Sequence, residues 1–260
     1  MYDTHAHLQF KDFDQDRDII IKESKEQGLK GIISIGIDYK TSLEALRLAK
    51  KYKDFCFAAV GIHPINVHKD GFDKLEFLKL AKMPEVVAIG EIGLDYYHSD
   101  KYKNKQKIIL KEQLDLALEL DLPVIFHCRG SQESPLSAYQ DLFDILKNYS
   151  NDLKGVVHCY SGNLDLAKKF INKGFYIGID GPITFKNAWE RLIKTAKNIP
   201  LKKILVETDC PYLTPEPYRG KRNKPWYVKF ILEKIANLRE EDLELSTKVI
   251  NENSKNLFKI

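Results

Sequence analysis

The stretch KQKIILKEQLDLALELDLPVIFHC, residues 105–128, contains the unit from which most of this chain is built. Residues 105–120 carry apolar side chains at the spacing of one helix face. Residues 123–128 form a short apolar run that ends near a histidine, and such runs are typical of buried parallel strands. Helices that alternate with buried strands indicate an α/β fold.

Seven further apolar runs alternate with stretches of helical period. They are YDTHAHL (2–8), GIISIGI (31–37), CFAAVGIH (56–63), EVVAIGEIG (85–93), GVVHCY (155–160), FYIGID (175–180) and ILVETD (204–209). Eight such units in 260 residues match the usual size of a TIM-type (β/α)8 barrel. We therefore predict an α/β barrel that spans residues 1–260 as a single domain, with a doubly wound sheet as the alternative.

Individual residues indicate where helices begin and end. Thr41 and Glu44 have the spacing of a capping box at the start of TSLEALRLAKKY. Gly28 and Gly174 stand where a helix should end before the next strand.

The composition restricts the class of protein. Lys and Arg number 41 against 37 Asp and Glu, and a net charge of +4 is too small to imply a nucleic-acid partner by itself. The chain has no apolar run long enough for a membrane span, no signal-peptide pattern and no C-x-x-C pair among its four cysteines. We expect a cytoplasmic protein with free thiols and no membrane partner, and a monomer is favoured.

Residues that can bind metal end most of the predicted strands. They are His5, His7, His63, Glu91, His127, His158 and Asp209. In a TIM barrel the C-terminal strand ends form the active face, so these side chains should converge there. A lone H-x-H pair is more often a packing or surface feature, but several imidazoles and carboxylates at one site are costly to bury without a cation. The pattern therefore predicts a metal centre.

Six of these residues exceed the ligands of one four-coordinate ion, which favours two divalent ions, Mg, Mn or Zn, about 4 Å apart. Glu91 is the expected bridge. Because alternate strand residues share a face, His5 and His7 should share one ion with Glu91 and Asp209, while His127 and His158 should hold the other. Asp209 is the expected general base, so Asp209 and Glu91 are the catalytic candidates.

Neighbours of these residues receive supporting roles. Asp3 and Glu207 lie one step deeper on the same strand faces and are expected to orient ligands. Cys128, Cys159 and Cys210 each follow a candidate ligand, and strand alternation should turn them into the helix layer.

Substrate contacts are expected from His63, which is not needed as a ligand, and from Arg129, although a structural histidine and a salt bridge are the alternatives. The segment PYRGKRNKPWYVKF, residues 217–230, places Arg219, Lys221 and Arg222 among aromatic residues after the last strand. Cations beside aromatic rings suit a nucleic-acid strand, and a solvated loop is the alternative.

Several strings together resemble one known family: DTHAHL, GIHP, GEIGLDYY, QKIILKEQLDLALELDLPVIFHCRG, VVHCYSG, ETDCPYLTP and YRGKRNKPWYV. From residue 3 to about residue 258 they closely resemble the TatD family of metal-dependent deoxyribonucleases, of the metal-dependent hydrolase superfamily. The resemblance implies a TIM barrel that cleaves phosphodiester bonds in DNA. It also implies metal binding at His5, His7, Glu91, His127, His158 and Asp209.

This chain departs from the family pattern at three positions. Gln9 stands where many members have Asp, Gly130 follows the arginine where an acidic residue is common, and Cys210 stands where Ser is usual. None of these removes a ligand, so they concern fine specificity.

We predict a deoxyribonuclease that hydrolyses DNA through a two-metal-activated water, acts like an exonuclease and favours single strands. One alternative is a hydrolase of a small cyclic amide or lactone. Some amidohydrolase-like enzymes of this kind use a carboxylated lysine after the fourth strand, whereas this chain has Glu91 and no lysine there, which disfavours the alternative. The other is a barrel that binds metal or nucleic acid without catalysis, which the intact ligand set disfavours.

Overall fold

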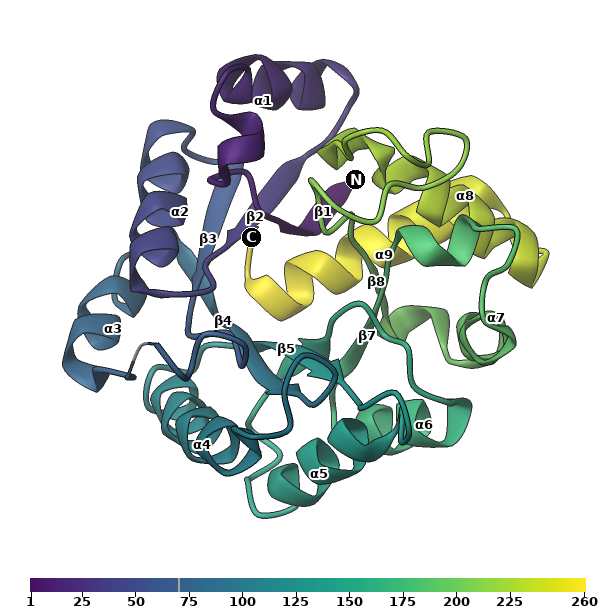
Figure 1. Cartoon of the computed structure of the whole chain (residues 1–260). Coiled ribbons are helices and arrows are strands. Elements are labelled where there is room, and N and C mark those ends of the chain that lie inside the picture. Colours follow the sequence, from purple (N-terminus) through teal and green to yellow (C-terminus); the bar gives the residue numbers. More distant parts are fainter. Residues whose placement is uncertain (70) are drawn as a thin grey trace.

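A computed structural model describes residues 1–69 and 71–260. Its centre is one parallel sheet whose strands follow the order β1 to β8, and the helices surround it on the outside (Figure 1). The strands are β1 Tyr2–Ala6, β2 Gly31–Ile35, β3 Cys56–Val60, β4 Val86–Asp95, β5 Val124–Arg129, β6 Gly155–Val157, β7 Tyr176–Ile179 and β8 Ile204–Val206. Each lies within or close to a predicted apolar run.

The helices lie outside the sheet, the first eight around it and the last at one end (Figure 1). They are α1 Arg17–Glu26, α2 Tyr39–Lys51, α3 Lys74–Ala81, α4 Lys103–Glu119, α5 Ser137–Leu146, α6 Leu164–Asn172, α7 Glu190–Asn198, α8 Val228–Arg239 and α9 Leu243–Phe258, with 3-10 turns η1 Lys11–Phe13, η2 Gly181–Thr184, η3 Leu201–Lys203 and η4 Pro225–Tyr227. None of the helices in the described part of the chain is long and apolar enough to cross a membrane.

The sheet closes between its last strand and its first. Just beyond β8, the Asp209 amide donates to the His5 carbonyl at 2.9 Å, and the His7 amide donates to the Cys210 carbonyl at 2.8 Å. These bonds join the chain after β8 to β1, and the predicted barrel is confirmed.

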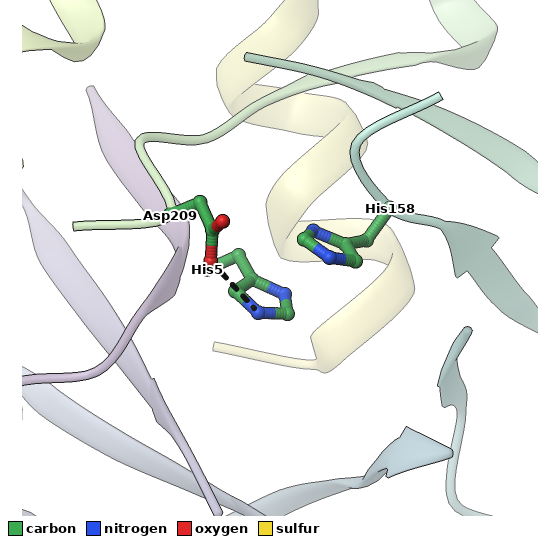
Figure 2. A group of neighbouring side chains, drawn as sticks. All are labelled: His5, His158 and Asp209. Carbon is green, nitrogen blue, oxygen red and sulfur yellow. Dashed lines mark ion pairs between the residues drawn. The ribbon is translucent and has the colours of Figure 1, made fainter. Parts of the chain in front are cut away.

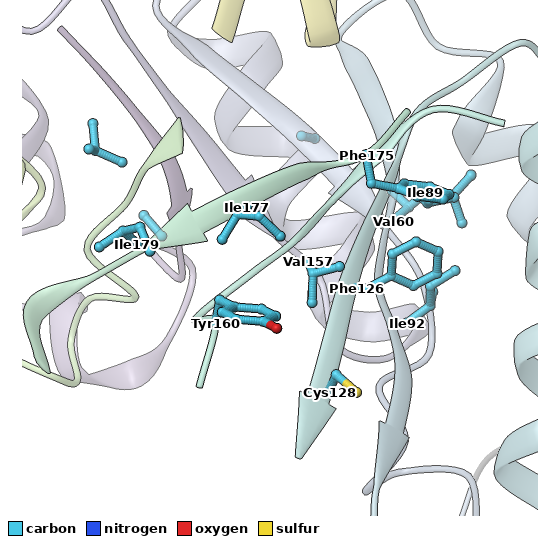
Figure 3. Close-up of a cluster of buried hydrophobic side chains, with 14 of the residues drawn as sticks. Val60, Ile89, Ile92, Phe126, Cys128, Val157, Tyr160, Phe175, Ile177 and Ile179 are labelled. Atoms are coloured by element: carbon cyan, nitrogen blue, oxygen red, sulfur yellow. The ribbon is translucent and has the colours of Figure 1, made fainter. Parts of the chain in front are cut away.

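Strand alternation divides the apolar core into two layers. Val60, Phe126 and Ile177 belong to the layer packed against the helices, part of which Figure 3 shows. Ile125 and Leu205, one residue out of phase, belong to a smaller cluster that fills the barrel interior.

Helix α9 covers the N-terminal end of the barrel and crosses its centre in Figure 1. Leu257 and Phe258 pack on the interior cluster, and the Asn253 side-chain amide donates to the carbonyls of Leu201 at 2.9 Å and Ile204 at 2.7 Å. Helix α9 therefore covers the interior of the barrel at this end, whereas the C-terminal ends of the strands open into a cavity.

The predicted helix ends are partly right. Gly28 and Gly174 have φ of +84° and +106°, the left-handed region that favours glycine after a helix. The predicted capping box is wrong in register, because α2 begins one turn earlier. The Asp38 carboxylate accepts from the Thr41 amide at 2.7 Å, and Thr41 completes the box.

We expect Asp3→Ala to lower the free energy of unfolding by about 3 kcal/mol. The buried Asp3 carboxylate accepts two hydrogen bonds from Thr208 across the closure, one from the Thr208 amide at 2.9 Å and one from the Thr208 hydroxyl at 2.5 Å. Asp3→Asn keeps one acceptor oxygen and should lose clearly less. Urea unfolding of both variants measures the difference. Equal losses would mean that the charge, and not the pair of hydrogen bonds, stabilises the closure.

Candidate metal centre

The barrel interior changes from apolar to polar toward the C-terminal ends of the strands. Ile125 is followed by His127 on the same face of β5, and Leu205 is followed by Glu207 and Asp209 along the chain from β8. A cavity of about 600 Å³ opens at this end. The apolar layer below keeps water from the base of the site, so the polar groups must satisfy one another or bind something else.

The Glu91 carboxylate lies at the centre of the polar groups. Its Oε2 is 3.4 Å from His5 Nε2 and 3.8 Å from His7 Nε2. Its Oε1 faces nitrogens of three other rings, at 2.9 Å from His127, 3.1 Å from His158 and 3.4 Å from His63. The two oxygens thus face different sets of imidazoles, an arrangement that suits a carboxylate between two ions.

Three groups of side chains among the described residues are close enough to hold a metal ion: His5, His7 and Glu91; His5, His158 and Asp209; and His63, Glu91 and His127. Figure 2 shows the second group, in which the rings of His5 and His158 stack at 3.7 Å. Asp209 Oδ1 lies 3.7 Å from His5 Nε2. His158 thus stacks on His5 and also shares Glu91 Oε1 with His127, so the expected division of the ligands stays a prediction.

His5 supplies the observation that best fits a metal. Its ring is fully buried, and within residues 1–69 and 71–260 neither ring nitrogen has a hydrogen-bond partner. A buried imidazole without partners is costly, and a divalent ion would satisfy its lone pair.

The electrostatics of the centre favour a cation. Burial alone would raise the pKa of Glu91, but the surrounding imidazoles hold it well below its usual value, so the carboxylate is charged. Burial alone would lower the pKa of His158, yet Glu91 and Glu207 raise it well above its usual value. A proton on this ring is stabilised by the same negative potential that would stabilise a metal ion.

Hydrogen bonds at Nδ1 separate the histidines into two kinds. His7 Nδ1 lies 2.9 Å from the Ile35 carbonyl, which accepts its proton and leaves the Nε2 lone pair facing the centre. His63 Nδ1 instead accepts from the Ile65 amide at 3.1 Å, so the neutral ring carries its proton on Nε2. Burial lowers the pKa of His63 to about 4, which keeps the ring neutral. His63 is therefore a hydrogen-bond donor, and His7 is suited to be a ligand.

Glu207 orients His158, as expected. Its Oε1 lies 3.1 Å from His158 Nδ1 and accepts from the Cys159 amide at 2.6 Å. Gly178 leaves room for this carboxylate, since a Cβ there would lie 2.6 Å from its oxygens. Asp3, the other expected orienting residue, instead binds backbone and hydroxyl groups: it accepts from the His5 amide at 3.3 Å and from Thr208.

Asp95 is a site residue that the sequence analysis missed. Its Oδ2 lies 2.8 Å from His127 Nε2, and its Oδ1 accepts from the His98 amide at 2.9 Å. Residues 91, 93 and 95 share one face of β4, so strand alternation from Glu91 contained the signal. Asp180, at the end of β7, also lines the cavity and was not predicted.

Two glutamines of α4 fix the backbone beneath the site. Gln113 Oε1 accepts from the Ile62 amide at 2.7 Å, next to His63. Gln106 Oε1 accepts from the Asp95 amide at 2.9 Å, and its Nε2 donates to the Asp95 carbonyl at 2.8 Å. The two glutamines lie two turns apart on one helix face, and both are buried.

Of the expected substrate contacts, His63 and Arg129 line the cavity, whereas Arg219, Lys221 and Arg222 do not. The guanidinium of Arg222 forms a salt bridge with Asp16, and that of Arg219 lies over the Phe185 ring at 4.1 Å. The basic segment therefore packs on neighbouring loops outside the cavity.

The expected orientation holds for Cys210, which belongs to the layer packed against the helices. Cys128 belongs to the same layer and also lines the cavity, so it lies at the boundary between the two. The expectation is wrong for Cys159, which lines the cavity. Strand β6 ends at Val157, and Cys159 has φ of +44°, so alternation no longer applies there.

Comparisons with known proteins identify the family and agree with the fold. The model of a family described as TatD related DNase matches residues 2–259. The uncharacterized metal-dependent hydrolase YabD of Bacillus subtilis is 38% identical, over 100% of this chain and 99% of that protein. The 3'-5' ssDNA/RNA exonuclease TatD of Salmonella typhimurium is 32% identical, over 100% and 99%. The crystal structure of YJJV, a TatD homolog from Escherichia coli, superposes with a TM-score of 0.90 at 29% identity, covering 100% of this chain and 98% of that one.

We expect Glu207→Gln to weaken metal binding by about 10- to 100-fold, because the neutral amide makes His158 a less basic ligand. Calorimetric titration of metal-free protein with Mn²⁺ or Zn²⁺ measures the affinity. Glu85→Gln, next to the N-terminal end of β4, removes a partly buried carboxylate away from the centre and serves as the control. Equal affinity in Glu207→Gln and the control would contradict the orienting role of Glu207.

Proposed function

We propose that this chain, which belongs to the TatD related DNase family, is a deoxyribonuclease that hydrolyses phosphodiester bonds of DNA. Family membership makes it a metal-dependent hydrolase. The single observation that carries the proposal is the buried His5 ring, whose nitrogens have no hydrogen-bond partner among the described residues and whose Nε2 faces the carboxylates of Glu91 and Asp209. Such a donor set is suited to divalent metal.

We propose two ions, Mg, Mn or Zn, with Glu91 between them. Their ligands would be His5, His7, His127, His158 and Asp209 together with Glu91. Divalent ions in such a site neutralise phosphate charge and lower the pKa of bound water. The residues around them hold the phosphate and accept the proton.

Asp209 is the proposed general base. Its side chain lines the cavity, and Oδ1 lies 3.3 Å from His7 Nε2. Burial alone would raise its pKa, but the neighbouring His7 and His158 rings lower it, which keeps the carboxylate free to accept a proton. Glu91 is the second proposed catalytic residue, through its position between the two ligand sets.

His63 and Arg129 are the proposed phosphate contacts in the cavity. His63 Nε2 lies 3.4 Å from Glu91 Oε1 and carries the proton of the neutral ring. A substrate oxygen that enters the same space could accept this proton. Arg129 lines the wall, with its guanidinium 3.7 Å from the centre of the Tyr97 ring. Stacking restrains the cation without neutralising its charge, so it can still pair with a phosphate.

We propose that the substrate is a single strand and that cleavage is exonucleolytic. The name of the Salmonella relative supports this choice. The cavity of about 600 Å³ also supports it, since this volume is in the range of pockets for one small ligand, and paired bases must leave the duplex to enter such a pocket.

End-labelled single- and double-stranded DNA, incubated with Mg²⁺, Mn²⁺ or Zn²⁺, tests the proposal. We expect single strands to be shortened, chelator to abolish cleavage, and Asp209→Asn to reduce kcat about 100-fold or more. Asp18→Asn, an exposed carboxylate outside the cavity, is the control. Cleavage by Asp209→Asn at the wild-type rate would refute the assigned base. Turnover of a lactone or cyclic amide without any action on DNA would favour the alternative hydrolase.

The assignment of His63 as a donor has its own test. We expect His63→Ala to lower kcat/KM at least about tenfold while the bound metal, measured by atomic emission, stays the same. His158→Ala should lose metal, because its Nε2 is a proposed ligand. His68→Ala, an exposed histidine outside the cavity, should change neither quantity. Metal loss in His63→Ala equal to that in His158→Ala would make His63 a ligand instead.

A further inference from the structure

The upper wall of the cavity carries aromatic side chains that the proposed chemistry does not use. Trp189 and Tyr212 both line the cavity, yet they are 54% and 52% exposed. Burial of a large aromatic side chain stabilises a protein or a complex. Two half-exposed rings beside a candidate active site are therefore suited to contact a ligand.

Trp189 stands at the start of α7, where the chain from β7 enters the helix. The guanidinium of Arg191 lies over the indole at 4.6 Å from the ring centre. This contact covers part of the indole and restrains it, while the remaining surface faces the cavity and solvent. Arg191 also brings a positive charge next to the ring.

Tyr212 is tied directly to the metal centre. Its amide donates to the Asp209 carbonyl at 2.9 Å, so the ring is held three residues from the proposed base. Its ring meets Phe10 edge-on at 6.4 Å, and Phe10 stacks on His7 at 4.5 Å. A continuous set of aromatic contacts therefore runs from a proposed ligand to the exposed Tyr212 ring.

The same pairing of a guanidinium with an aromatic ring occurs at Arg129, which lines the cavity and stacks on Tyr97. Aromatic rings paired with guanidinium groups around one cavity match a chain in which flat bases alternate with phosphates. By contrast, Trp226 and Tyr227 of the basic segment are only 8% and 9% exposed, so they cannot stack on bases.

We infer that Trp189 and Tyr212 form a base-stacking site that holds unpaired nucleobases of the strand whose phosphate lies at the metal centre. This inference rests on the proposed function and names the part of the substrate that the wall recognises. A base can stack on these rings only when it is unpaired, because a paired base stays inside the duplex. The same two rings therefore select single strands over duplex.

The test separates bases from phosphates. The probes are two fluorescein-labelled phosphorothioate hexamers, one made of thymidylates and one made of abasic tetrahydrofuran residues that keep the phosphates but carry no base. Fluorescence anisotropy gives the Kd of each hexamer for the metal-loaded protein. We expect Trp189→Ala and Tyr212→Ala each to weaken binding of the thymidylate hexamer on the order of tenfold, with little change for the abasic hexamer. Trp189→Phe should restore most of the affinity.

Leu245→Ala is the matched control, since Leu245 is an apolar residue 58% exposed on α9, outside the cavity. Three outcomes would overturn the inference. The wild-type protein could bind both hexamers with equal Kd, it could bind neither, or Trp189→Ala could weaken the binding of both equally. Hydrolysis of an unmodified hexamer is measured alongside. Base-dependent binding without hydrolysis would support the stacking site and refute the nuclease, whereas hydrolysis with base-independent binding would do the reverse.

Discussion

The barrel is closed by hydrogen bonds from residues of the candidate metal centre. Asp209 and His7 use their backbone amides to join the end of β8 to β1, while their side chains face each other in the cavity. A barrel has no free edge only if this closure is complete, so the fold and the site depend on the same few residues. The Asp3 carboxylate strengthens the closure from below by accepting from Thr208. Correct closure therefore brings the first and last candidate ligands together.

The second constraint is the cost of burying so many polar groups. Glu91 and Asp209 keep their charge because imidazoles surround them, and His158 keeps its orientation because Glu207 accepts from it. Further out, Gln106 of α4 holds the backbone of Asp95. The polar base of the cavity suits a phosphate with metal, and the aromatic wall suits bases. Together the two regions support the proposed nucleic-acid substrate, as does the exonuclease name of the Salmonella relative.

Much of the fold and of the site could be predicted from local sequence, because strand alternation needs no knowledge of distant residues. Each observed strand lies within or close to an apolar run, and the polar residues that follow on the same face meet in the cavity. Strand alternation no longer applies at Cys159, which has a left-handed backbone and lines the cavity. Alternation does apply at Asp95, which β4 carries on the same face as Glu91, but this residue was missed.

The sequence by itself determined the repeating units, the positions of the polar residues on them and the resemblance to TatD enzymes. Only the tertiary structure decided what each residue contacts. The His63 ring is a donor because Ile65 donates to its Nδ1, and the Ile35 carbonyl gives His7 the opposite tautomer. Arg222 lies outside the cavity because Asp16, far away in the chain, forms a salt bridge with it. Tautomers, ion pairs and exposure depend on contacts between distant segments, and no periodicity within one segment contains them.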